Sequence, residues 1–180
     1  QEGPAGFSKS VVVKVAHAQH VNDPNMVELF LREARVGARL NHQNLVQIFD
    51  LGEANGQYFI AMEYVDGLTL LQLTKRCWAI GHGIPMEVAV RVIAAAAQGL
   101  HNAHTLVGAD GSAAGIIHRD ISPDNIMIAR DGAVKVLDFG VAKLTGTETT
   151  QSGEIKGKVP LMSPEQIDPE ADVDARTDLW

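Results

Sequence analysis

The sequence has a single cysteine and no long hydrophobic run. Cys77 stands alone among 180 residues, so no disulfide can form within the chain and a reducing, cytoplasmic setting is favoured. The most apolar stretch, residues 88–100, is interrupted by Arg91 and Gln98 and is too short to span a bilayer. No signal peptide is recognisable. We therefore expect a cytoplasmic protein, with any membrane anchor lying beyond Trp180.

Positive charge is also scarce. The chain holds 15 basic and 22 acidic residues, which gives a net charge of −7. A negative chain is repelled by phosphate backbones and by anionic lipids, so neither nucleic acid nor a membrane surface is expected as the main partner. Hydrophobic residues make up 46% of the sequence, which is enough for the core of one domain or of a small two-lobed unit.

The hydrophobic pattern predicts strands early in the chain and helices in its middle. Asn55-Gly56 is typical of a turn between strands, and Asp23-Pro24 is typical of a helix N-terminus. The last predicted helix is apolar on most of its faces, so we expect it to be buried. Residues 108–115 are expected to form a small surface insertion. The predicted strands cover residues 11–16, 45–50 and 57–63, and the predicted helices cover residues 24–40, 68–77 and 86–107.

The residues best suited to chemistry lie within residues 116–140, which read IIHRDISPDNIMIARDGAVKVLDFG. Two short apolar runs flank the pair Asp131-Gly132, a strong signal for a hairpin turn. Asn125 enters the first run and Asp138 follows the second. Because a hairpin brings its two open ends together, these two side chains should lie side by side.

Asn125 and Asp138 would then offer an amide oxygen and a carboxylate to one hard cation such as Mg²⁺. Asp120 lies five residues before Asn125, on the loop that leads into the hairpin. Its carboxylate can accept or orient a hydroxyl proton while the cation neutralises charge on a transferred phosphoryl group. The pattern therefore predicts phosphoryl transfer by positioning and electrostatics.

The motifs HRDISPDN at residues 118–125 and DFG at residues 138–140 resemble the catalytic loop and the metal-binding motif of eukaryotic-type protein kinases. The surrounding sequence is most similar to bacterial serine/threonine kinases. This resemblance implies an α+β, two-lobed fold, with a partial N-lobe of a small antiparallel sheet and one helix at residues 1–65 and a mainly helical partial C-lobe at residues 66–180. It also implies ATP and Mg²⁺ as cofactors, and transfer of the γ-phosphate to serine and threonine hydroxyls of protein substrates.

A lysine–glutamate pair is predicted in the first lobe. Glu33 falls in the apolar stripe of the first helix, where a buried carboxylate needs a cation, and Lys14 on the first strand is the natural partner. Glu28 is the rival carboxylate, but it lies off that stripe and is expected to be solvated. The run VVVK together with Glu33 resembles the kinase lysine strand and helix glutamate, which implies that Lys14 is held on the ATP phosphates.

The stretch MEYVDG at residues 62–67 reads as an extended linker whose free backbone groups can bond a flat heterocycle. The resemblance identifies this linker as the hinge between the lobes. It implies that Met62 is the gatekeeper and that the backbones of Glu63 and Val65 read adenine. Ordinary core packing is the alternative interpretation of Met62.

Beyond the DFG motif the chain is polar and rich in hydroxyl groups, and it then reads Ser-Pro-Glu at residues 163–165. This order resembles an activation segment, while a plain threonine-rich linker is the alternative. We expect autophosphorylation, with self-association, first at Thr150 and then at Thr149 or Ser152. Arg119, directly before the catalytic aspartate, could clamp such a phosphate.

Three further residues can be compared with the sequence pattern of the kinase family. Asp178 resembles the aspartate of the central helix that braces the catalytic loop. Ser122 stands where serine/threonine kinases usually carry a lysine, and Lys158 stands where they usually carry a threonine. We hypothesise that the ammonium of Lys158 reaches towards Asp120 and the γ-phosphate and replaces the missing charge. In the alternative interpretation Lys158 points into solvent.

No glycine-rich loop precedes Lys14, and the resemblance covers only part of a catalytic domain, so we expect this stretch to be inactive by itself. Two alternatives to a protein kinase are open. A pseudokinase scaffold is disfavoured because competent residues stand at Lys14, Asp120, Asn125 and Asp138. A small-molecule phosphotransferase of related fold is disfavoured by the threonine-rich segment before residues 163–165, which such an enzyme does not need.

Overall fold

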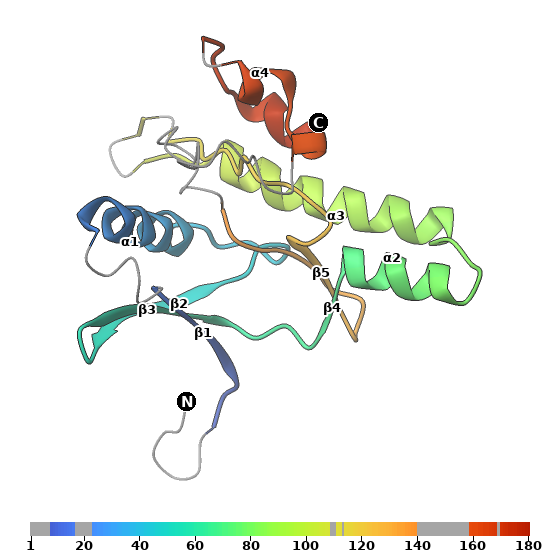
Figure 1. Cartoon of the computed structure of the whole chain (residues 1–180), viewed down its shortest axis with the longest axis horizontal. Coiled ribbons are helices and arrows are strands. Elements are labelled where there is room, and N and C mark those ends of the chain that lie inside the picture. The colour runs from blue at the N-terminus through green and yellow to red at the C-terminus, as the bar shows by residue number, and fades with distance from the viewer. Residues whose placement is uncertain (1–7, 17–22, 109–110, 113, 140–158, 169) are drawn as a thin grey trace.

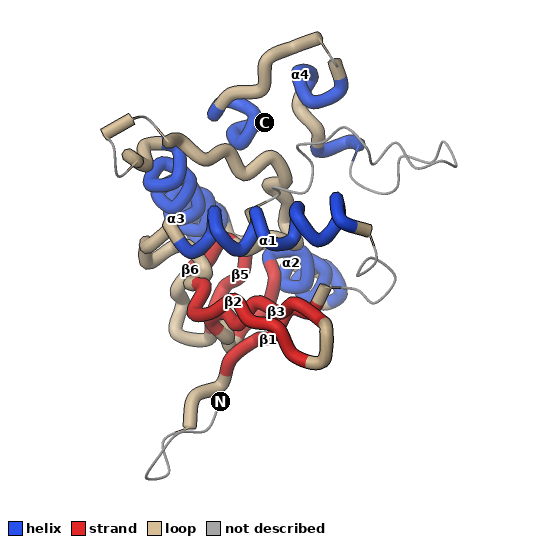
Figure 2. The backbone as a smooth tube through the Cα atoms, turned by 90° about the vertical axis from the view of Figure 1, so that its left-hand side faces the viewer, coloured by secondary structure: helices blue, strands red, loops and turns tan. Residues whose placement is uncertain are grey.

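Two small antiparallel sheets and a group of helices make up the fold. The strands lie towards one end of the molecule and the C-terminal helix α4 (Pro164–Ile167) towards the other, as both views show (Figures 1 and 2). The architecture is the predicted α+β arrangement. The computed structural model describes residues 8–16, 23–108, 111–112, 114–139, 159–168 and 170–180.

The first sheet has the strand order β1-β3-β2 and is antiparallel throughout. Its register places Lys14 opposite Ile60, so the lysine strand pairs along its length with the strand that leads to the predicted hinge. Asn55 and Gly56 have φ values of 53° and 74°, which fit the predicted tight turn between the two longer strands. The three strands are β1 (Val11–Val15), β2 (Ile48–Ala54) and β3 (Gln57–Glu63).

The start of β2 differs from the prediction. We expected a strand over residues 45–50, whereas β2 begins at Ile48. The reason is that the preceding residues belong to the other sheet: Leu45 forms a parallel bridge with Val136, and the Val46 N–H donates to the Val136 carbonyl at 3.0 Å. Residues 45–54 therefore tie the two sheets together.

The second sheet contains the predicted catalytic hairpin. Its strands, in the order β4-β5-β6, are β4 (Gly67–Thr69), β5 (Ile126–Ala129) and β6 (Val134–Val136). Ile126 pairs with Val136 and Ile128 with Val134, which confirms the predicted hairpin. Residues 64–66 link the two sheets, so the predicted hinge is shorter than expected. The boundary between lobes at residues 65 and 66 falls in this link and stays a prediction.

Close backbone contact at Gly67 gives a test of the second sheet. A Cβ atom at this position would lie 2.1 Å from the carbonyl oxygen of Ile128, so Gly67→Ala must push β4 away from the hairpin. We expect the substitution to lower the free energy of unfolding of the protein by about 1–3 kcal/mol, as overpacked sites do. Gly83→Ala is the control, because its Cβ would meet nothing within 4 Å. Equal denaturation midpoints for the two variants would contradict the packing of β4 on β5.

Three longer helices surround the sheets. The predicted N-cap of the first is present, since Asp23 Oδ1 accepts a hydrogen bond from the Asn25 N–H at 2.9 Å. The second helix begins later than predicted because residues 67–69 form β4, and Thr69 caps the helix with Gln72. None of the described helices is long and apolar enough to cross a membrane. The three are α1 (Pro24–Ala38), α2 (Leu70–Ala79) and α3 (Met86–His104).

Helix α3 is not buried on most sides, contrary to the sequence-based expectation. Met86, Val90 and Ile93 are 74%, 58% and 57% exposed. The opposite face of the helix packs on β6 and carries mostly small side chains, which let the helix lie close to the hairpin. The shared core formed there consists of Leu40, Leu45, Val92, Ala96, Ala103, Ile116, Ile126, Val134, Val136 and Phe139.

Candidate active site

The predicted lysine–glutamate pair is present and has a third member. Lys14 Nζ lies 2.5 Å from Glu33 Oε1 and 3.4 Å from Asp138 Oδ1. Strand β1, helix α1 and the residue after the hairpin thus converge on one ammonium group. The rival carboxylate, Glu28, instead pairs with Arg35 at 2.8 Å, and both of these side chains are exposed, as expected.

Burial and charge act in opposite directions on this cluster. Burial by itself would lower the pKa of the Lys14 ammonium, but the carboxylates of Asp138 and Glu33 outweigh it and leave that pKa raised. Lys14 is therefore a fixed cation at neutral pH. Burial raises the pKa of the Glu33 carboxyl, while the charge of Lys14 acts against that shift. The two carboxylates thus fix the position of the Lys14 ammonium.

The open ends of the hairpin lie together. The Leu137 N–H donates to the Asn125 carbonyl at 2.9 Å, which holds Asp138 next to the start of β5. Asn125 Nδ2 donates to the Asp120 carbonyl at 2.8 Å and to Asp120 Oδ2 at 3.1 Å. The side-chain nitrogen of Asn125 thus donates to Asp120, and the side-chain oxygen is the atom suited to binding a cation. Asp138 is half exposed and has a φ of 40°.

Asp178 braces the catalytic loop, as the resemblance implied. Its fully buried carboxylate accepts hydrogen bonds from the His118 N–H at 2.8 Å and the Arg119 N–H at 2.7 Å. A third bond at 2.7 Å joins it to Nε2 of His104, at the end of α3. Arg119 has a φ of 66°, a left-handed conformation that costs a residue with a side chain about 1–2 kcal/mol. The loop therefore needs such a brace.

His118 connects this loop to the DFG motif. It is fully buried, and its Nε2–H donates to the Leu137 carbonyl at 2.7 Å, while Nδ1 accepts from the Asp120 N–H at 3.2 Å. Burial lowers the pKa of His118, in agreement with a neutral ring that donates at one nitrogen and accepts at the other. The ring also packs against Phe139 with centroids 4.8 Å apart. Asp120 and Asp138 are thereby held on one rigid unit.

The predicted hinge region contains an ion pair that the sequence did not reveal. Glu63 Oε1 lies 2.8 Å from Lys135 Nζ, and Glu63 Oε2 accepts from the Gln47 N–H at 3.2 Å. The side chain of Glu63 thus joins β3 to β6, which leaves its backbone as the candidate for adenine binding. Met62 lines a small cavity together with Glu33 and Asp138, and this placement fits a gatekeeper next to the lysine pair.

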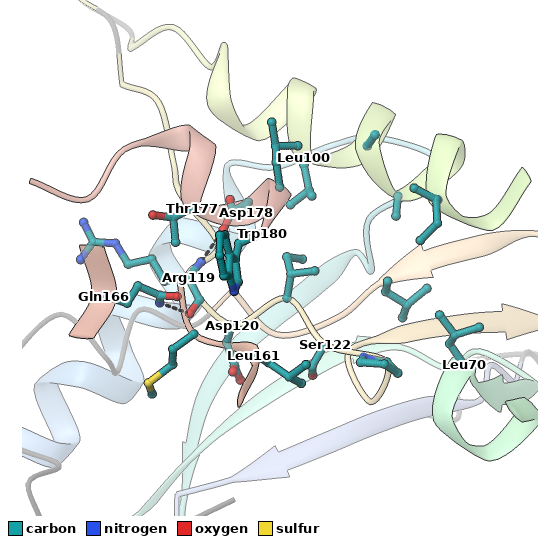
Figure 3. Close-up of a pocket in the computed structure, with 18 residues that line it drawn as sticks. Leu70, Leu100, Arg119, Asp120, Ser122, Leu161, Gln166, Thr177, Asp178 and Trp180 are labelled. Atoms are coloured by element: carbon teal, nitrogen blue, oxygen red, sulfur yellow. Dashed lines mark hydrogen bonds between the residues drawn. The ribbon is translucent and has the colours of Figure 1, made fainter. Parts of the chain in front are cut away.

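A larger cavity of about 270 Å³ lies behind the catalytic loop, between that loop, α3 and the C-terminal segment (Figure 3). Arg119, Asp120 and Gln166 are among its lining residues, with Trp180 on the C-terminal side. Gln166 Nε2 donates to the Arg119 carbonyl at 2.7 Å. Sequence reasoning missed Gln166, because a glutamine after a Ser-Pro-Glu motif carries no sign of a distant partner.

Several predicted residues lie outside the part of the chain that the structure describes. These include Lys158 and the expected phosphorylation sites Thr150, Thr149 and Ser152. Ser122 is described and is 3% exposed, with its carbonyl accepting from the Asn125 N–H at 2.9 Å. The proposed exchange of charge between positions 122 and 158 stays a prediction.

Fold and site together show a lysine–carboxylate cluster and a braced aspartate loop on an α+β framework with two antiparallel sheets. The family model for the protein kinase domain matches residues 5–180. The chain belongs to the protein kinase family. The kinase domain of PknI from Mycobacterium tuberculosis has a similar structure, with a TM-score of 0.69 and 29% identity over 96% of this chain and 60% of that one.

Similar sequences include three bacterial proteins that are named as kinases. Tyrosine-protein kinase MasK of Myxococcus xanthus is 41% identical over 99% of this chain, and serine/threonine-protein kinase PknB of Mycolicibacterium smegmatis is 41% identical over 96% of it. A third, serine/threonine-protein kinase pkn3 of Myxococcus xanthus, is 39% identical over 97%. The chain spans 28%, 27% and 31% of the length of these relatives, respectively.

Proposed function

We propose that the protein is an ATP-dependent protein kinase that phosphorylates serine and threonine residues. The observation that carries the proposal is the convergence of Glu33 and Asp138 on Lys14, on the same unit that holds Asp120 beside Asn125. Similarity to relatives named serine/threonine-protein kinases supports serine and threonine hydroxyls as the acceptors of the phosphate.

Each site residue has a proposed role. Lys14, oriented by Glu33, binds the phosphates of ATP, and the backbones of Glu63 and Val65 bind its adenine behind Met62. Asp120 orients the acceptor hydroxyl and takes its proton. The remaining two donors, an amide oxygen at Asn125 and a carboxylate at Asp138, suit Mg²⁺, which would neutralise charge on the transferred phosphoryl group.

The partners are proposed on the same basis. Protein substrates are expected, together with a second copy of the kinase for autophosphorylation at Thr150, Thr149 or Ser152. A cytoplasmic location is part of the proposal, because the lone Cys77 and the proposed use of ATP favour it. Lys158 is proposed as a further catalytic cation. The alternative interpretation is that its side chain points into solvent.

The name of one relative, a tyrosine-protein kinase, makes tyrosine the competing acceptor. The test incubates the protein, expressed from its complete gene, with radiolabelled ATP, Mg²⁺ and a mixed protein substrate. Analysis of the phosphorylated amino acids should give phosphoserine and phosphothreonine. Phosphotyrosine alone would overturn the proposal that serine and threonine are the acceptors. Absence of transfer together with retained nucleotide binding would favour a pseudokinase.

A further inference from the structure

The backbone of Arg119 is held at both of its polar groups. Its N–H donates to Asp178 Oδ1 at 2.7 Å, and its carbonyl accepts from Gln166 Nε2 at 2.7 Å. Figure 3 shows these two bonds on either side of the Arg119 main chain, with Asp120 directly next to it. Arg119 has a φ of 66°, which is unfavourable for a residue with a side chain, so both bonds help to hold its backbone in this conformation.

Both the oxygen and the nitrogen of the Gln166 side-chain amide form hydrogen bonds. Its Oε1 accepts from the Ser163 N–H at 3.1 Å and completes the capping box of α4, while its Nε2 reaches the Arg119 carbonyl. Glutamate could form the same capping box, but an ionised carboxylate cannot donate a hydrogen bond. The bond to the catalytic loop therefore depends on an amide at this position, and the helix cap does not.

The contact also links two separate parts of the sequence. Gln166 and Arg119 lie 47 residues apart in the sequence. Asp178, which is also in the C-terminal segment, accepts a hydrogen bond from the N–H of the same Arg119. Ser163, at the start of this C-terminal segment, is 1% exposed and lies 3.4 Å from the hydroxyl of Thr177, so the segment is itself anchored. A donor carried by this anchored segment can fix the carbonyl that immediately precedes Asp120.

We propose that Gln166 is a positioning residue for phosphoryl transfer, which holds the Arg119 carbonyl and thereby the orientation of Asp120. The inference rests on the proposed kinase function. Gln166 does not touch a reacting atom. Its loss should lower kcat and leave the KM for ATP nearly unchanged, because Lys14 and the hinge are not involved.

The test compares Gln166→Glu and Gln166→Ala in the protein expressed from its complete gene. The glutamate keeps the cap of α4 but places a negative charge against the Arg119 carbonyl, whereas alanine removes the cap and leaves that carbonyl to water. Positioning therefore predicts that Gln166→Glu loses at least as much kcat as Gln166→Ala, about tenfold or more. A role limited to helix capping predicts the opposite order.

Gln72→Glu is the matched control. Gln72 is exposed and completes a similar capping box with Thr69 in α2, so its change to glutamate should leave kcat within twofold of the unmodified enzyme. Hydrogen exchange of the peptide that covers residues 117–121 gives a readout that does not need activity. Exchange there should be faster in Gln166→Glu than in Gln72→Glu.

The outcomes separate this inference from the proposed function. Unchanged kcat and unchanged exchange in Gln166→Glu would overturn the positioning role while the kinase activity stands. Faster exchange in Gln166→Glu, in a protein that transfers no phosphate even without substitution, would overturn the kinase function and retain Gln166 only as a clamp on the loop.

Discussion

Replacing Asp138 by asparagine is expected to lower the rate of phosphate transfer by about 10³-fold, since a carboxylate that would hold Mg²⁺ is worth several kcal/mol of transition-state stabilisation. This carboxylate also forms an ion pair with Lys14, because Asp138 Oδ1 lies 3.4 Å from Lys14 Nζ. The amide would remove one of the two negative charges that hold the lysine. Transfer of radiolabel should therefore fail even at high ATP concentration.

Asp131→Asn is the control for this prediction. Asp131 lies in the turn of the same hairpin, where its Oδ1 accepts from the Ala133 N–H at 3.0 Å, a bond that an asparagine oxygen can also accept. Its activity should match the unmodified enzyme. Nucleotide affinity measured over a range of Mg²⁺ concentrations should weaken in Asp138→Asn only. A similar dependence on Mg²⁺ in both variants would show that Asp138 does not take part in metal binding.

The parts of the fold that could be predicted are those with strong local signals. Asp131-Gly132 between two β-branched runs predicted the hairpin, and the structure contains it, with Ile126 opposite Val136. The Lys14–Glu33 pair was also found, although 19 residues separate the two, because a carboxylate in an apolar helix stripe requires a cation. In both cases the physical demand is visible in a short stretch of sequence.

The contacts that could not be predicted join residues whose types are ordinary at the surface. Lys135 in β6 and Glu63 in β3 lie 72 residues apart, and nothing in either strand indicates that their side chains meet. The exposure of α3 was mispredicted for a related reason. Its apolar composition shows that it can be buried, but composition does not show which face the hairpin covers.

Asp120→Asn is expected to lower kcat by about 10²–10⁴-fold, the usual effect of removing a general base, with little change in the affinity for ATP. Asparagine keeps the shape of the side chain and an oxygen that can accept from Asn125 Nδ2, which donates to Asp120 Oδ2 at 3.1 Å. The backbone bonds of the loop to Asp178 and His118 involve no side-chain atom of Asp120. The loop should therefore stay folded while it loses the proposed general base.

Asp124→Asn tests whether the loss is specific to that carboxylate. Asp124 belongs to the same loop but is exposed, so its change to asparagine alters the charge nearby by the same amount without touching the proposed base. Single-turnover transfer and nucleotide binding, measured separately for both variants, distinguish chemistry from affinity. Near-normal transfer by Asp120→Asn would show that Asp120 does not act as the base. An equal loss in Asp124→Asn would show that the loop contributes only its overall negative charge.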